Sequence, residues 1–177
     1  MAVAGFEHVP AGALAVLRWL EANHVEFVLV GAVARAARGE VSASGPVAIV
    51  PAPYGRNLDR LSRALVSAHA RQRVDPVGAP SPPGDGTAPI QLTADKLGGA
   101  QRWAVRCGSH DLDVEGRPAG VPRYQELLYE ASRFELAEGV TVEVAAPEDI
   151  ELYDHVRRTG VSPEIRVSRA ARQPRAF

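Results

Sequence analysis

Cysteine is almost absent from this chain, which has 177 residues and a single cysteine, Cys107. One cysteine excludes an intrachain disulfide and any zinc cluster that needs several thiolates. Because a lone thiol commonly packs as a small hydrophobic side chain, we interpret Cys107 as a core residue rather than a nucleophile.

Long hydrophobic runs are also missing. No apolar stretch approaches the roughly 18 residues that cross a bilayer, and Met1 to Pro10 lacks the basic residues and the long apolar stretch of a signal peptide. We therefore expect a cytoplasmic protein that does not associate with membranes. The length fits one domain with at most a small appendage, and a hydrophobic fraction of 46% is sufficient for a core.

Acidic residues are scarce at the C-terminal end. From Arg157 to Phe177 the chain has six arginines and one acid, Glu164, whereas the preceding 156 residues hold 14 basic and 20 acidic side chains. The body is thus mildly acidic, and residues 159–177 form a basic tail. Such a tail is typical of solvated, flexible segments, and its charge also suits nucleic acid or an acidic partner. The tail has no Tyr or Trp on which bases could stack.

Hydrophobic periodicity predicts alternating helices and strands. Short apolar runs rich in Val, Ile and Phe indicate buried strands, and apolar residues at three- and four-residue spacing indicate amphipathic helices. The expected helices are Ala11–His24, Ala32–Arg38, Asn57–His69, Thr93–Gln101, Pro122–Ala131 and Pro147–Arg158. The expected strands are Glu26–Gly31, Val47–Val50, Trp103–Cys107, Asp111–Glu115, Phe134–Leu136 and Val140–Val144.

Helix caps and a loop complete the predicted organisation. Asn57 is expected to cap the third helix and Thr93 the fourth. Residues 75–89 hold five prolines and three glycines, which predicts a flexible surface loop rather than a core element. The order α-β-α-β-α, a loop, then β-β-α-β-β-α predicts an α/β (α+β) fold in which helices pack on a mixed sheet.

This ordered series resembles the minimal nucleotidyltransferase family, which includes bacterial antitoxin- and toxin-type nucleotidyltransferases. The similar segments cover most of residues 11–158. They are the strand and glycine Phe27–Gly31, the strand Val47–Pro53, the helix with Asn57, Leu58 and Leu61, the hairpin Cys107–Val114, then Gly120, Tyr124 and Val142–Ile150. The resemblance implies a nucleotidyltransferase-like domain at residues 1–158.

Catalysis in that family depends on carboxylates that hold divalent metal ions against a nucleoside triphosphate. An Asp-x-Asp pair on one strand aims two carboxylates at one point, because residues two apart face the same side. The matching positions here are Pro46 and Ala48, which offer no side-chain oxygen. Only Asp113 matches, as the third carboxylate. The lysine that the family often carries near its last helix is also missing, because the only lysine is Lys96.

Asp111, Asp113 and Glu115 form a second carboxylate pattern, with all three side chains on one face of a predicted strand. A solvated strand face is the plain interpretation. If a metal site persists, these three residues would be its ligands, and Asp111 and Asp113 would be remnant catalytic residues. We expect no cofactor; magnesium and a nucleoside triphosphate would serve any activity that remains.

The turn after the first strand is the expected phosphate side. Backbone N–H groups at a helix start can approach phosphates, and the resemblance assigns this role to Gly31 and Ala32, with Arg35, Ser42 and Ser44 nearby. Ala32 stands where the family has a second glycine. Surface ion pairs and loop hydrogen bonds are the alternative roles of Arg35 and the two serines.

Three hypotheses about function follow, in order of preference. The first is a catalytically degenerate nucleotidyltransferase-like protein that binds a partner protein, itself, or a nucleotide without chemistry. The second is an active metal-dependent nucleotidyltransferase whose site is rebuilt on Asp111, Asp113 and Glu115. The third is a nucleic-acid-associated accessory protein that uses the arginines of the tail.

Overall fold

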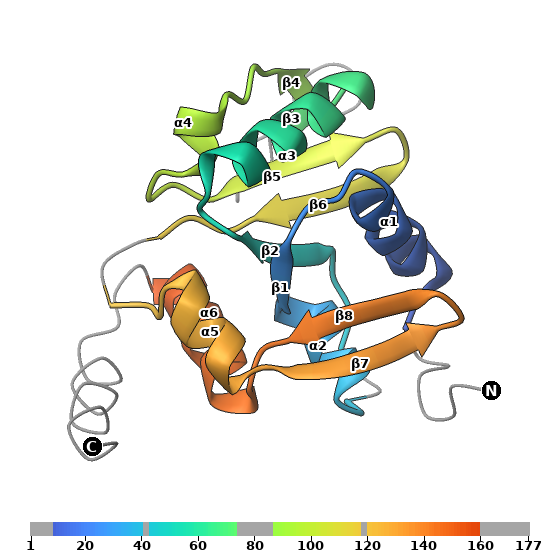
Figure 1. Cartoon of the computed structure of the whole chain (residues 1–177), viewed down its shortest axis with the longest axis vertical. Helices are drawn as coiled ribbons and strands as arrows, with labels where there is room; N and C mark the ends of the chain where they lie inside the picture. Colours follow the sequence, from blue (N-terminus) through green and yellow to red (C-terminus); the bar gives the residue numbers. More distant parts are fainter. Residues whose placement is uncertain (1–8, 41–42, 74–86, 118–119, 160–177) are drawn as a thin grey trace.

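An eight-stranded mixed sheet organises the part of the chain that the computed structural model describes, residues 9–40, 43–73, 87–117 and 120–159 (Figure 1). The strands are β1 (Phe27–Val30), β2 (Val47–Pro51), β3 (Arg71–Arg73), β4 (Thr87–Pro89), β5 (Trp103–Cys107), β6 (His110–Val114), β7 (Ser132–Ala137) and β8 (Val140–Val144). The helices are α1 (Ala11–Ala22), α2 (Gly31–Ala37), α3 (Gly55–Ser67), α4 (Ala94–Leu97), α5 (Tyr124–Glu130) and α6 (Pro147–Thr159). The predicted class, an α/β (α+β) fold with helices packed on a mixed sheet, is confirmed.

The strand order is β4-β3-β5-β6-β2-β1-β8-β7. At its centre, β2 runs parallel to β6 and antiparallel to β1, and β1 runs parallel to β8. All five residues of β2 are buried, as are the last three of β1. Continuous apolar sequence suits these strands because helices cover both faces of the sheet.

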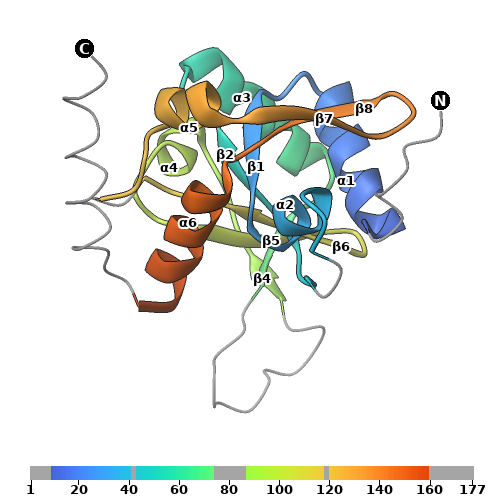
Figure 2. The same ribbon diagram turned by 90° about the horizontal axis from the view of Figure 1, so that it is seen from below.

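Successive residues of β6 show which helices cover which face, because their side chains point to opposite sides of the sheet. Leu112 lines a cavity with residues of α1, while the next residue, Asp113, contacts Arg157 of α6. Helix α6 also packs against α2. Figure 2 shows α2 and α6 on the side of β1 and β2 that is opposite α3.

None of the helices in the described ranges has the length and apolar character needed to cross a lipid bilayer.

The sheet extends further than predicted at one edge. Strands β3 and β4 pair with each other, and β3 also pairs with β5. The prediction that residues 75–89 form only a loop is therefore wrong for Thr87–Pro89, which make up β4; residues 74–86 lie outside the described ranges. The three-residue strands carry too little hydrophobic alternation for a sequence pattern to reveal them, and Pro89 is tolerated because β4 is an edge strand.

Asn57 has a different role from the predicted helix cap. Helix α3 begins at Gly55, so Asn57 lies inside its first turn, where it is 1% exposed. Its Oδ1 accepts from the backbone N–H of Glu26 at 2.7 Å, and its Nδ2 donates to the carbonyls of Glu26 and Ala52, each at 2.9 Å. Asn57 therefore ties the residues flanking β1 and β2 to α3. The Thr93 cap of α4 is confirmed, since its hydroxyl accepts from the Lys96 N–H.

Replacement of Asn57 by Ala is expected to lower the free energy of unfolding by about 3 kcal/mol, because buried backbone groups lose their partners. Urea denaturation followed by circular dichroism measures this change. The matched control is Asp59→Ala, an exposed position in the same helix, where a change within about 0.5 kcal/mol is expected. Equal stability of the two variants would contradict the bridging role.

Candidate functional site

The position opposite Asp113 in the sheet is Ala48. The two residues are paired in the parallel register of β2 and β6, and Ala48 is fully buried. Gly31, at the start of α2, lies against Ala48: a Cβ added to Gly31 would be 2.9 Å from the Ala48 Cβ, and Gly31 has φ +75°. Pro46 is half-buried just before β2. Small apolar groups therefore fill the place beside Asp113.

Asp113 is a buried carboxylate that three arginines surround. It is 2% exposed. Its Oδ1 accepts from Nη2 of Arg73, on β3. Its Oδ2 accepts from Nη1 of Arg102 at 3.0 Å and lies 3.5 Å from Nη2 of Arg157, on α6. Both carboxylate oxygens thus face guanidinium groups, which offset the cost of burying the charge.

The two neighbouring carboxylates are paired in the same way. Asp111 accepts from Nε of Arg106 at 2.8 Å and from Nη1 of Arg73 at 3.3 Å. Glu115, 7% exposed, accepts from Nη2 of Arg157. Asp111 and Asp113 share one arginine, and Asp113 and Glu115 share another, so the three carboxylates lie on one face as predicted. We call these three carboxylates and their four arginines the carboxylate–arginine cluster.

Two carboxyl groups of this cluster have shifted pKa values in opposite directions. Burial works to raise the pKa of Asp111, but Arg106 and Arg73 outweigh it and hold the pKa below its ordinary value. Burial raises the pKa of Glu115 above its ordinary value, against the opposing effect of Arg157. Charge on Asp111 therefore stabilises the folded chain, whereas charge on Glu115 is opposed by its surroundings.

The cluster does not fit a magnesium ion. Four guanidinium groups face three carboxylates, which leaves a formal charge of +1. Arginine cannot be deprotonated in a protein, so a divalent ion would have to displace cations from every ligand. Within the described ranges, no three His, Cys, Asp or Glu side chains gather in an arrangement that could hold a metal ion.

The expected phosphate-side residues are spread over different environments. Gly31 and Ala32 lie at the start of α2, Ser44 is exposed, and Ser42 lies outside the described residues. Arg35 does not face an open site, because its Nε donates to Asp154 at 2.8 Å and its Nη2 lies 2.8 Å from Glu151. Burial works to lower the pKa of Arg35, but these carboxylates outweigh it and raise the pKa.

Helix α6 is fixed over the cluster from two sides. Arg35 of α2 pairs with Asp154 and Glu151 of α6, and Arg157 of α6 pairs with Asp113 and Glu115. Arg157 therefore belongs to the folded body, although the charge count groups it with the basic tail. Residues 160–177 of the tail lie outside the described ranges.

Four arginines of the site were not predicted from the sequence. One signal was available: the predicted turn at Gly108 and Ser109 implies that Arg106 faces Asp111, and this register is observed. Arg73 reaches the site through the unpredicted strand β3. Arg102 and Arg157 approach from segments whose packing no local pattern specifies.

No protein-family model matches the sequence, and no curated protein matches it. These comparisons therefore do not identify the site.

Cys107 lies beside an apolar cavity of about 270 Å³ between α1 and the β5–β6 hairpin, which Trp19 and His110 also line. The thiol is half-buried. Burial, and to a lesser extent the Asp111 carboxylate, raise the pKa of Cys107 to about 11. A raised pKa leaves little thiolate near neutrality, which agrees with a packing residue rather than a nucleophile.

Replacement of Asp113 by Asn is expected to lower the free energy of unfolding by about 3–5 kcal/mol, because Arg73 and Arg102 then lack a charge partner in a buried site. Glu115→Gln is the matched control: the surroundings already oppose charge on Glu115, so a loss within about 1 kcal/mol is expected. Urea denaturation at neutral pH compares the two. Similar losses in the two variants would show that burial, not the pairing of Asp113 with arginines, determines the loss in the free energy of unfolding.

The pKa of Cys107 predicts slow alkylation. At pH 8 the folded chain is expected to react with iodoacetamide roughly a hundredfold more slowly than the same chain in denaturant, because the thiolate fraction falls with the raised pKa. The folded rate should increase as pH rises towards 11. Mass spectrometry of quenched samples measures both rates, and equal rates would contradict a raised pKa.

Proposed function

We propose that this chain is a cytoplasmic, nucleotidyltransferase-like protein that no longer catalyses nucleotidyl transfer and acts by binding. The observation that carries the proposal is the state of Asp113, the one carboxylate that matches the family pattern. It is buried beside Ala48 and held by arginines from β3, α6 and the segment before β5. Metal-dependent nucleotidyl transfer needs carboxylate oxygens that are available to cations.

The register of the central strands supports the family assignment within this proposal. In the family, a strand with Asp-x-Asp lies beside the strand that supplies the third carboxylate. Here β2 lies beside β6, with Ala48 paired to Asp113, and a glycine turn joins β1 to α2. The order of these two strands agrees with the family pattern, whereas the side chain at the Asp-x-Asp position differs from it.

A rebuilt catalytic site on the same strand is less well supported. It would require Asp111, Asp113 and Glu115 to converge on metal ions, yet each accepts a hydrogen bond from an arginine. The nucleic-acid hypothesis stays a prediction, because residues 160–177 lie outside the described ranges. Arg157 is not available to it, since this side chain is committed to Glu115 and Asp113.

A protein partner suits one exposed surface. Tyr129 on α5 is 88% exposed, and Tyr54 is 48% exposed. Gln125 donates to the Tyr54 hydroxyl and lies one helical turn before Tyr129, on the same face of α5. Exposed tyrosines are frequent in protein interfaces because they combine apolar area with a hydroxyl.

The proposal predicts no transfer activity. The wild-type chain is incubated with labelled ATP, GTP, CTP or UTP and with magnesium or manganese, in the presence of protein and RNA acceptors. No label should appear on any acceptor above the level of heat-denatured chain. Label that requires metal, disappears with Asp113→Asn and remains with Asp59→Ala, an exposed position outside the cluster, would contradict the proposal. Circular dichroism on each variant confirms that it is folded at the assay temperature.

A further inference from the structure

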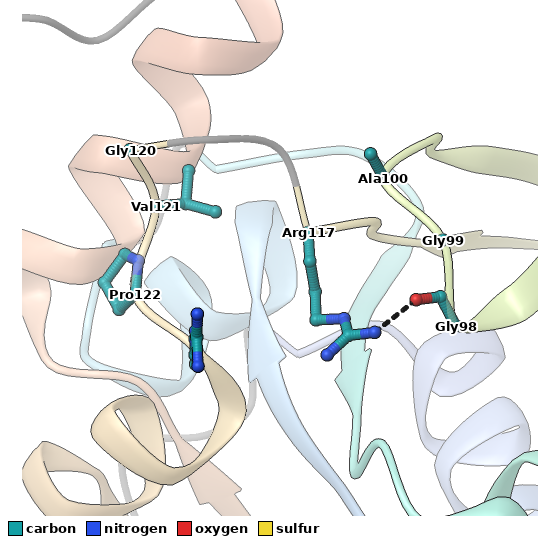
Figure 3. A pocket seen from close by; sticks show the side chains of 8 residues that line it. Gly98, Gly99, Ala100, Arg117, Gly120, Val121 and Pro122 are labelled. Atoms are coloured by element: carbon teal, nitrogen blue, oxygen red, sulfur yellow. Dashed lines mark hydrogen bonds between the residues drawn. The ribbon is translucent and has the colours of Figure 1, made fainter.

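A cavity of about 410 Å³ is lined by residues that do not belong to the carboxylate–arginine cluster. Its two walls are the segments 98–100, after α4, and 120–123, before α5; Arg117 lies between them. We call it the Arg117 pocket. Figure 3 shows the Arg117 side chain extending towards Gly98, with Gly120, Val121 and Pro122 across from it.

Backbone contacts fix one wall of the pocket. A Cβ at Gly116 would lie 2.1 Å from the carbonyl oxygen of Ala100, so only glycine allows the two segments to cross. The Arg117 N–H donates to the Gly99 carbonyl at 3.1 Å, and its Nη2 donates to the Gly98 carbonyl. Within the described residues, this one bond orients the Arg117 guanidinium and leaves the rest of its five donors without a protein acceptor.

The opposite wall is anchored to α6. The hydroxyl of Tyr153, a residue that is 4% exposed, donates to the Pro122 carbonyl at 2.9 Å. Arg123 follows directly, and its backbone N–H donates to Glu126 at 3.1 Å. Both walls thus have fixed positions before any ligand binds.

The charge of the pocket is positive. Of the described residues, two arginines and no acid line it. Among the described residues, no carboxylate lies within ion-pair distance of the side chains of Arg117 or Arg123, whereas Arg73, Arg102 and Arg157 are all paired. Two arginines that have no carboxylate partner among the described residues suit the charge of a phosphate group, and a guanidinium fork binds phosphate oxygens in pairs.

We propose that the Arg117 pocket binds a phosphate-bearing anion through Arg117 and Arg123. The cavity is large enough for a diphosphate group. Among the described residues no aromatic side chain lines it, so these residues offer no surface on which a base stacks, and the pocket recognises the phosphates rather than the nucleoside. This site uses none of the residues of the cluster and does not depend on the loss of transfer activity.

Calorimetric titration of the full chain with inorganic pyrophosphate, without metal, tests the site. We expect saturable binding that weakens as salt rises and that is at least about tenfold weaker in Arg117→Gln and in Arg123→Gln. Arg117→Lys keeps the charge but loses the guanidinium fork, so its affinity for pyrophosphate should lie between those of wild type and Arg117→Gln. Arg63→Gln, an exposed arginine on α3 outside the pocket, should bind as wild type does.

A second titration with ATP, again without metal, separates phosphate recognition from nucleotide recognition. Because no aromatic group of the described residues lines the pocket, ATP should bind no more than about tenfold more tightly than pyrophosphate. The proposal is overturned by an absence of pyrophosphate binding in folded wild-type chain, or by undiminished binding when both arginines are replaced by Gln. Much tighter ATP binding would overturn recognition of phosphates alone.

Discussion

The pairing of Asp113 with arginines joins parts of the chain that are distant in sequence. A charged carboxylate at 2% exposure needs hydrogen-bonded partners of opposite charge. Arg73, Arg102 and Arg157 supply them from β3, from the segment before β5 and from α6. The edge of the sheet and the covering helix are thereby positioned relative to β6, and with them the Pro122 wall that α6 anchors.

This pairing also determines the chemistry of the face. Buried ion networks contribute little net stability compared with apolar packing, but they penalise arrangements in which one charge loses its partner. Arg73 and Arg157 each contact two of the three carboxylates, so the cluster fits together in one arrangement. The same contacts occupy the oxygens that a metal ion would need. Under the proposed function, this face holds the folded chain together and takes no part in catalysis.

The sequence predicted the elements that form from a local pattern of residues. The buried strands β1 and β2, the β5–β6 hairpin and α6 follow from apolar runs, a Gly108–Ser109 turn and a proline start, and all were predicted. Asn57 was misread because its amide bonds to residues that are distant in the chain. Strands β3 and β4 are too short for periodicity to reveal. The arginine partners of Asp113 depend on those missed contacts. The three carboxylates of the cluster were therefore predicted, but the arginines that neutralise their charge were not.

Manganese binding tests the central claim most directly. The wild-type chain is titrated with Mn²⁺, and the signal of free ion is followed by electron paramagnetic resonance. If arginines neutralise Asp111, Asp113 and Glu115 as described, free Mn²⁺ should rise from the first addition, with no saturable site tighter than about 1 mM. A saturable site of higher affinity that is lost in Asp113→Asn and kept in Asp59→Ala would contradict the account.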